Sequence, residues 1–342
     1  MNPYILTILL FGLGLGTTIT FASSHWLLAW MGLEINTLAI LPLMTQHHHP
    51  RAVEATTKYF LTQATAAAML LFASTTNAWL TGQWNIQQMS HPIPITMIIL
   101  ALALKIGLAP THSWLPEVLQ GLDLTTGLIL STWQKLAPFA LLLQVQPNTT
   151  LLITLGLLST LVGGWGGLNQ TQLRKILAYS SIAHLGWMML VLPYSPSLAL
   201  LTLLIYITMT FSTFLTFKLN KATNVNALAI SWTKAPVLTS LTPLILLSLG
   251  GLPPLTGFLP KWFILQELTK QELAPTATLA ALTALLSLYF YLRLSYAYIT
   301  MSPTSIAQHL TSPSPATLHC LTATATITLL PLTPAAMALL KL

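Results

Sequence analysis

The sequence predicts an all-α polytopic membrane protein, and three observations lead to that class. Hydrophobic residues make up 54% of the 342 residues, whereas charged residues make up 6%, against about 25% in an ordinary soluble domain. Apolar runs recur along the whole chain. Each is long enough to supply the roughly 20 residues that a helix needs to cross a bilayer. A water-soluble fold would need surface polarity that this composition lacks.

Eleven apolar segments follow one another, which predicts about 11 transmembrane helices in one antiporter-like transmembrane domain of residues 1–342. Segments one to five, at about 3–145, and six to ten, at about 149–299, are expected to form two inverted five-helix repeats. The extra helix at about 317–340 completes the chain. The expected spans are 3–22, 25–45, 56–79, 93–120, 125–145, 149–168, 174–193, 197–217, 237–268, 276–299 and 317–340.

The fourth and ninth segments are interrupted in their middles. The fourth contains Gly107 and Pro110, and the ninth contains three glycines and two prolines within 250–257. Proline removes a backbone donor and clashes with the preceding turn, so each helix is expected to break there. Paired interruptions at matching positions of two halves are typical of inverted-repeat transporters.

Ionisable residues also recur at matching places in the two halves. The second and fifth segments of each half carry one in their interior, and each broken segment carries a lysine beside its break. The lysine lies 71 residues after the second-segment residue in the first half and 77 residues after it in the second. The matched pairs are Glu34 with His184, Lys105 with Lys261, and Lys135 with Arg293.

Four of these residues, Glu34, Lys105, Lys135 and Lys261, indicate proton movement. A charge at the centre of a membrane helix costs roughly 2.5–3.5 kcal/mol. A buried ion pair between Glu34 and Lys105 would stabilise the fold little, because desolvation offsets the attraction. Moving the carboxylate nearer or farther would load or release the proton of the lysine, which makes a switch. Lys261 lies nearer a segment end, so snorkelling to the interface competes with the functional interpretation.

Two histidines are further candidates for a hydrated proton path, His112 after the first break and His184 in the seventh segment. The run 47–49, three histidines, has no spaced carboxylate or cysteine and is expected to be a solvated loop, so no metal site is predicted. One cysteine, Cys320, excludes a cysteine-ligated iron–sulfur cluster within this chain. No nucleotide or flavin motif is present, so no catalytic residue, redox site or bound cofactor is expected.

The net charge of +7 does not indicate nucleic acid, because its distribution follows the membrane. If the segments alternate, one side receives most of the basic residues and the other receives little beyond Lys270 and Lys341. The positive-inside rule then places the N-terminus on the matrix or cytoplasmic side and the C-terminus on the opposite side. The basic side carries Arg51, Lys58, Arg174, Lys175, Lys218, Lys221 and Lys234.

Three motifs resemble the antiporter-like subunits of respiratory complex I. They are Lys105-x₄-Pro110-Thr111-His112-x-Trp114-Leu115-Pro116, the run 173–186 ending in His184-x-Gly186, and Gly251-Leu252-Pro253-Pro254-x₂-Gly257-Phe258-x₂-Lys261-Trp262. The resemblance covers essentially the whole chain. It implies that Glu34 is the family's acidic partner, Lys105 and Lys261 the lysines of the broken helices, and Lys135 the central lysine.

The resemblance also implies a function and a setting. The chain is expected to be a proton-translocating membrane-arm subunit, coupling NADH oxidation by ubiquinone to proton pumping across the inner mitochondrial membrane. NADH, FMN, iron–sulfur clusters and ubiquinone would be bound by other subunits. The expected partners are other membrane-arm subunits and membrane lipid, with cardiolipin as a candidate, and no nucleic acid. The N-terminus would face the matrix and the C-terminus the intermembrane space.

Two alternatives remain open from the residues alone. A free-standing cation/proton antiporter needs the same buried charges but no redox partner, and co-purification with an NADH-oxidising assembly separates the two. An inert assembly scaffold would tolerate neutralisation of Glu34 and Lys105 together without loss of activity.

Overall fold

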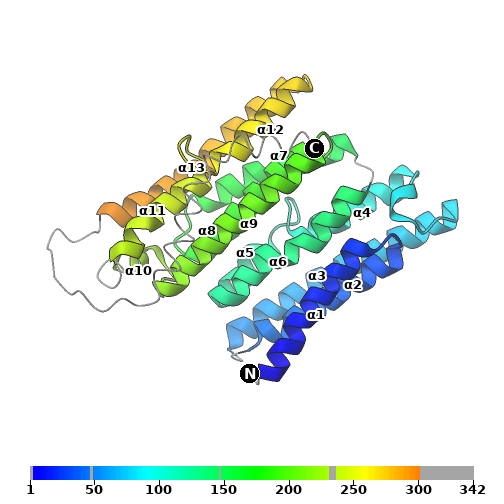
Figure 1. Ribbon diagram of the computed structural model, residues 1–342, viewed down its shortest axis with the longest axis horizontal. Helices are drawn as coiled ribbons and strands as arrows, with labels where there is room; N and C mark the ends of the chain where they lie inside the picture. Colours follow the sequence, from blue (N-terminus) through cyan, green and yellow to red (C-terminus); the bar gives the residue numbers. More distant parts are fainter. Residues whose placement is uncertain (1–2, 47–48, 146–147, 231–235, 301–342) are drawn as a thin grey trace. The chain divides into compact units, whose positions relative to one another are not determined.

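The computed structural model describes residues 3–46, 49–145, 148–230 and 236–300, so the expected segment 317–340 lies outside the described residues. Within these ranges the chain is α-helical, apart from one 3₁₀ turn and two isolated β-bridges (Figure 1). It divides into two compact units, Met1–Leu155 and Gly156–Leu342.

The first unit contains the first six helices and the start of the seventh. Its α6 packs against α1, α2 and α4, and its α3 packs against α2, α4 and α5. The bounds are α1 Pro3–Ala22, α2 Trp26–Met44, α3 Pro50–Thr81, the 3₁₀ turn η1 Ile86–Gln88, α4 Pro92–Ile106, α5 Trp114–Gly121, α6 Leu124–Gln144 and α7 Thr149–Gly167.

In its described part, the second unit contains the rest of α7 and six further helices. Its α13 packs against α8, α10, α11 and α12, and its α9 packs against α8, α11 and α12. The bounds are α8 Leu173–Val191, α9 Pro196–Leu219, α10 Val225–Ile230, α11 Pro236–Gly250, α12 Phe258–Lys270 and α13 Ala274–Thr300.

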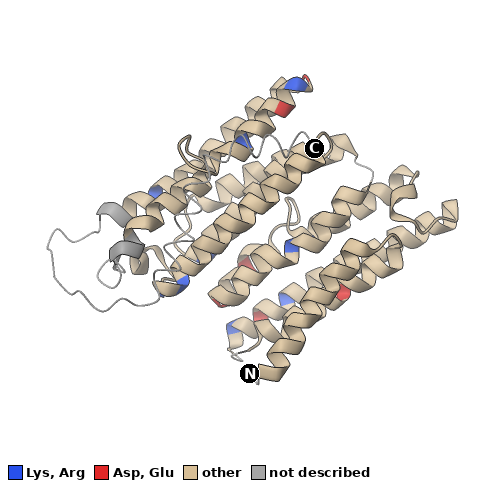
Figure 2. Cartoon of the chain, in the orientation of Figure 1, with Lys and Arg blue, Asp and Glu red and all other residues tan. Residues whose placement is uncertain are grey.

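The polytopic helical class is confirmed, while the count of eleven spans stays a prediction. Among the described residues, five helices are long and apolar enough to cross a membrane: Pro3–Ala22, Trp26–Met44, Thr149–Gly167, Pro196–Leu219 and Ala274–Ala297. The helices α4 and α11 are shorter because their segments are broken. Figure 2 shows how little of the described fold carries charge.

Proline and histidine set where several helices begin. Pro50, Pro92, Pro196 and Pro236 are the first residues of α3, α4, α9 and α11, where the missing proline N–H needs no helical partner. The His49 side chain accepts a hydrogen bond from the backbone N–H of Arg51 at 3.2 Å. The helix α3 therefore starts six residues before the expected span 56–79, because an apolar window leaves out the charged residues of its first turns.

Most of the threonine and serine hydroxyls within the described helices donate to a carbonyl of their own helix. Buried threonines and serines donate to the carbonyl three or four residues earlier, as Thr20 does to Thr17 at 2.7 Å and Ser180 to Leu177 at 2.8 Å. A polar group without such a partner would be costly in an apolar medium. The chain can therefore carry many hydroxyls inside a membrane-embedded fold.

Each unit contains an isolated β-bridge at a corresponding place, which supports the interpretation of the units as repeats. An isolated antiparallel bridge joins the residue before α2 to the loop after α3, His25 with Asn85, and another joins the residue before α8 to the loop after α9, Gln172 with Asn224. The first bridge is flanked by a hydrogen bond from Trp26 N to Trp84 O at 3.1 Å. The second is flanked by one from Leu173 N to Thr223 O, also at 3.1 Å.

Candidate functional site

The first break lies between α4 and α5, where the helix ends at a glycine. Gly107 has φ +88°, a left-handed conformation that favours glycine. The backbone N–H groups of Gly107 and Leu108 both donate to the carbonyl of Ala103, each at 2.9 Å. This closes the last turn of α4, as left-handed helix ends commonly do.

Two side chains from other helices satisfy further carbonyls of this turn. Trp114 Nε1 of α5 donates to the carbonyl of Leu104 at 3.1 Å, and Gln63 Nε2 of α3 donates to the carbonyl of Lys105 at 3.3 Å. Non-helical backbone at membrane depth is tolerated only where it is buried in protein or lines a wet cavity. These bonds show how the broken helix is held.

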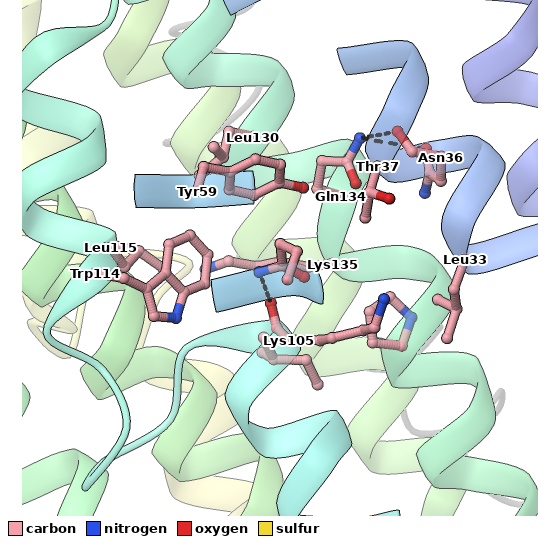
Figure 3. A pocket seen from close by; sticks show the side chains of 13 residues that line it. Leu33, Asn36, Thr37, Tyr59, Lys105, Trp114, Leu115, Leu130, Gln134 and Lys135 are labelled. Atoms are coloured by element: carbon pink, nitrogen blue, oxygen red, sulfur yellow. Dashed lines mark hydrogen bonds between the residues drawn. The ribbon is translucent and has the colours of Figure 1, made fainter. Parts of the chain in front are cut away.

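The lysines Lys105 and Lys135 line the same small cavity (Figure 3). Lys105 is 5% exposed and Lys135 is 2% exposed. The cavity measures about 10 Å³, close to the smallest volume that holds one water molecule. Its polar lining also includes Asn36, Thr37, Tyr59, Gln63 and Gln134.

Glu34 lies beside this cavity but does not form the expected direct ion pair with Lys105. Within the described residues, the buried Lys105 Nζ has no hydrogen-bond partner. The half-buried Glu34 carboxylate instead accepts a hydrogen bond from Thr37 Oγ1 at 3.3 Å. The ion pair that the sequence allowed is therefore not a direct contact in this structure, because side-chain direction and helix register decide such contacts and the sequence alone fixes neither.

His112 lies in the segment between α4 and α5, apart from the cavity lining. The ring is half-exposed, and its Nδ1 is 3.2 Å from the carbonyl oxygen of Pro110. Its role in a hydrated path stays a prediction.

The second break, between α11 and α12, is held by Lys261. Gly251 has φ +81°, and the Lys261 ammonium donates to the carbonyl of Gly250 at 2.8 Å. This is the carbonyl end of α11, where the helix dipole favours a cation. A side chain at Gly257 would collide with the Ser248 carbonyl, so the two half-helices cross where only glycine fits.

The two lysines lie on opposite sides of their breaks. Lys105 belongs to the last turn of α4, whereas Lys261 belongs to the first turn of α12 and reaches back to the end of α11. The sequence order already implied this arrangement, since Lys105 precedes Gly107 and Pro110 whereas Lys261 follows the glycines and prolines of 250–257.

His184 and Lys261 line two neighbouring small cavities within the second unit. One, of about 20 Å³, also has Tyr206 and Met209 in its wall. The other, of about 10 Å³, also has Ser287 and Tyr291 in its wall. The His184 and Tyr206 rings are 5.6 Å apart between centroids. The structure thus brings together the two predicted residues of this half.

Arg293, matched with Lys135 at the sequence level, does not line either cavity. Its side chain is exposed, and its guanidinium donates to the carbonyl of Leu168 at 2.5 Å. Tyr291 takes the inward place: it is 1% exposed and follows Lys261 by 30 residues, as Lys135 follows Lys105. The match between Lys135 and Arg293 was therefore wrong by two residues, which moves a side chain to another face of a helix.

Sequence reasoning missed most of the polar residues that line these cavities, among them Tyr59, Gln63, Tyr206 and Tyr291. A tyrosine in an apolar helix is usually part of the core, so composition gave no sign of them. One signal was available. Tyr206 follows Tyr59 by 147 residues, the separation between the first residues of α8 and α2, and each lines a cavity of its own unit.

A charged cluster joins α3 to α5 outside the cavity. The Lys58 ammonium is 2.8 Å from Glu54 and 2.8 Å from Glu117. The hydrogen bond from Lys58 holds the pKa of the exposed Glu54 below its usual range. This cluster fixes α5, and with it Trp114, to the start of α3. Among the described residues, no group of three or more His, Cys, Asp or Glu side chains could hold a metal ion.

Broken helices with buried lysines define a class of membrane subunit, and the comparisons with known proteins agree with that class. Residues 23–287 match the family described as "NADH:quinone oxidoreductase/Mrp antiporter, TM". The fold is similar to a chain of respiratory complex I from Thermus thermophilus, with a TM-score of 0.86, 30% identity, and 99% of this chain and 80% of that chain covered. An archaeal membrane-bound sulfane sulfur reductase shares the fold, with a TM-score of 0.84, 19% identity, and 97% and 74% of the two chains covered.

The chain belongs to this family of membrane subunits of NADH:quinone oxidoreductases and Mrp antiporters. NADH-ubiquinone oxidoreductase chain 2 of Tetraodon nigroviridis is 74% identical over the full length of both chains, and that of Oncorhynchus mykiss is 69% identical, also over full length. These relatives confirm the resemblance to complex I. They also agree with its narrower form, subunit 2 of the mitochondrial enzyme of animals, to which the opening residues 1–3, Met-Asn-Pro, also point.

Proposed function

We propose that this chain is a proton-translocating membrane-arm subunit of respiratory complex I, the H⁺-translocating NADH:ubiquinone oxidoreductase. The observation that carries the proposal is the pair of buried lysines, Lys105 and Lys135, in the wall of one cavity beside a broken helix. Membership of the family supports it. The chain carries the proton-moving part of the reaction, while NADH, FMN, the iron–sulfur clusters and ubiquinone are bound by other subunits.

The proposed mechanism rests on repulsion between like charges. In a low-dielectric interior two ammonium groups at one cavity repel each other strongly. Protonation of Lys105 therefore promotes release of the proton from Lys135, and protonation of Lys135 promotes release of the proton from Lys105. The half-buried Glu34 does not contact Lys105 directly. When its distance from Lys105 changes, the preference of the proton for Lys105 or Lys135 changes. Moving one charge against 100 mV requires about 2.3 kcal/mol, which redox chemistry in other subunits supplies.

In the second unit, His184 and Lys261 are the proposed proton-carrying groups. Both side chains line the two small cavities there. A proton can therefore pass between His184 and Lys261. The Gly250 carbonyl fixes the Lys261 side chain. We propose that charge changes in the first unit pass to this pair. His112, beside the first break, is the proposed contact of the path with bulk water.

The proposed setting is the mitochondrial inner membrane, with the N-terminus in the matrix and the C-terminus in the intermembrane space. The excess of basic residues on one side supports this orientation. The partners are other membrane-arm subunits and lipid, with cardiolipin as a candidate.

A native gel of mildly solubilised membranes tests the proposal. The gel is stained for NADH oxidation, and the chain is located by peptide mass spectrometry. We expect the chain in the large NADH-oxidising band. Recovery of the chain alone, in a small inactive band, would replace the proposal by a free-standing cation/proton antiporter.

A further inference from the structure

The amide of Gln134 lies in the wall of the cavity that holds Lys105 and Lys135, and its orientation is fixed from one side. Gln134 Nε2 donates to Asn36 Oδ1 at 3.2 Å and to the Asn36 carbonyl at 3.3 Å (Figure 3). The NH₂ side of the amide is therefore directed toward Asn36 of α2. The amide oxygen Oε1 is left as an acceptor at the cavity, with no hydrogen bond to any described residue.

Asn36 is held firmly enough to act as an anchor. It is 1% exposed, and its backbone packs against α1 at Gly16, where an added side-chain carbon would lie 2.9 Å from the Asn36 nitrogen. Rotation of the Gln134 amide would turn its hydrogens toward two lysines, which carry only donors when charged. The anchored orientation instead presents an acceptor to them.

We propose that Gln134 is a positioning residue for proton transfer between Lys105 and Lys135, and that Asn36 fixes its orientation. The amide oxygen stabilises whichever ammonium is charged through one water molecule, for which the cavity has about the minimum volume. The amide itself neither gains nor loses a proton. It therefore stabilises the ammonium without holding the proton in place. A carboxylate at this position would hold the proton on the lysine.

The titratable groups around Gln134 are Glu34 from α2, Tyr59 from α3, Lys105 from α4 and Lys135 from its own helix. The inference rests on the proposed function, because it assigns a role within the proton path of the first unit.

The test compares two nearly isosteric variants in the assembled complex, reconstituted into liposomes with a proton-sensitive dye. We expect Gln134→Leu, which removes the acceptor, to lower the rate of proton pumping at least about tenfold at every pH. We expect Gln134→Glu to lower it at neutral pH and to recover as the pH rises, because a carboxylate holds a proton on the lysines more tightly. Gln144→Leu and Gln144→Glu, at the end of the same helix, are the matched controls and should pump normally.

Asn36→Ala is the third variant. It removes the Oδ1 acceptor but leaves the Asn36 carbonyl and Gln134 itself, so we expect a smaller loss than in Gln134→Leu. Wild-type rates and an unchanged pH profile in both Gln134 variants would overturn the inference, and so would failure of all three variants to assemble, which would assign Gln134 to folding. Lys105→Met, measured alongside, separates failure of the proposed function from failure of the inference about Gln134. Full pumping in Lys105→Met would refute the proposed function, whereas loss there with normal Gln134 variants would refute the inference alone.

Discussion

Replacing Gly163 by alanine should destabilise the second unit and disturb its candidate site. A side-chain carbon at Gly163 would lie 2.6 Å from the backbone nitrogen of Ala183 and 2.9 Å from its Cα. Carbon atoms pack at about 3.5–4.0 Å, so α7 and α8 would have to move apart by roughly 1 Å. Ala183 directly precedes His184, so this movement would also displace the ring from its cavities.

The magnitude follows from two opposing terms. Alanine in a helix interior gains up to about 1 kcal/mol over glycine, whereas forced expansion of a packed contact costs about 1–3 kcal/mol. A displaced backbone cannot yield as a flexible side chain can, so the cost should dominate. We expect a net loss of about 1 kcal/mol or more, together with a lower rate of proton pumping.

Gly14→Ala is the matched control, because an added carbon at Gly14 meets nothing within 4 Å. The assay is the thermal inactivation midpoint of the purified complex, with pumping measured in liposomes. We expect the midpoint to fall in Gly163→Ala and to stay equal or rise in Gly14→Ala. Equal midpoints and equal pumping in the two variants would refute this account of the helix contact.

Three further predictions concern the first break, a cavity of the second unit and the ion cluster between α3 and α5. Gln63→Leu leaves the Lys105 carbonyl without its donor, and a membrane hydrogen bond is worth about 0.6–1.7 kcal/mol. Amide hydrogen exchange at Gly107 and Leu108 should therefore accelerate about threefold to twentyfold. Tyr291→Phe removes a buried hydroxyl beside Lys261, and proton pumping should slow severalfold while the amount of assembled complex stays the same. Glu117→Gln weakens an exposed ion cluster, so it should lower the thermal midpoint slightly at low salt and hardly at all at high salt.

Each of these predictions has a clear contrary result. Ser74→Ala serves as control for Gln63→Leu, since its hydroxyl bonds only within its own helix, and equal exchange in the two variants would contradict the capping role. Unchanged pumping in Tyr291→Phe would remove Tyr291 from the path. A salt-independent effect of Glu117→Gln would mean that packing, and not charge, holds α5 to α3.

The sequence predicted the broken helices well because their causes are local. Proline and glycine act on the backbone where they stand, so the positions of the breaks after Lys105 and before Lys261 follow from the residues alone. The sequence marked Lys105 and Lys135 separately as buried charges, and only the packing of α4 against α6 shows that both line one cavity.

The remaining features depend on side-chain direction, which the sequence does not specify. Glu34 does not contact Lys105, and Arg293 points away from the cavities. A shift of one helical turn or less along the helix decides each of these outcomes. The polar residues Gln63 and Gln134 act through bonds to α4 and α2, which only the packing of these helices reveals. Tyrosines such as Tyr291 have the same sequence appearance in a core as in a proton path.

Whether Lys105 carries protons is decided by the number of protons moved per NADH oxidised in the assembled Lys105→Met complex. Methionine keeps much of the length and removes the charge, so the cavity should survive without its proton carrier. We expect coupled pumping to be largely lost while the complex still assembles. An assembled variant with unchanged proton stoichiometry would contradict this expectation.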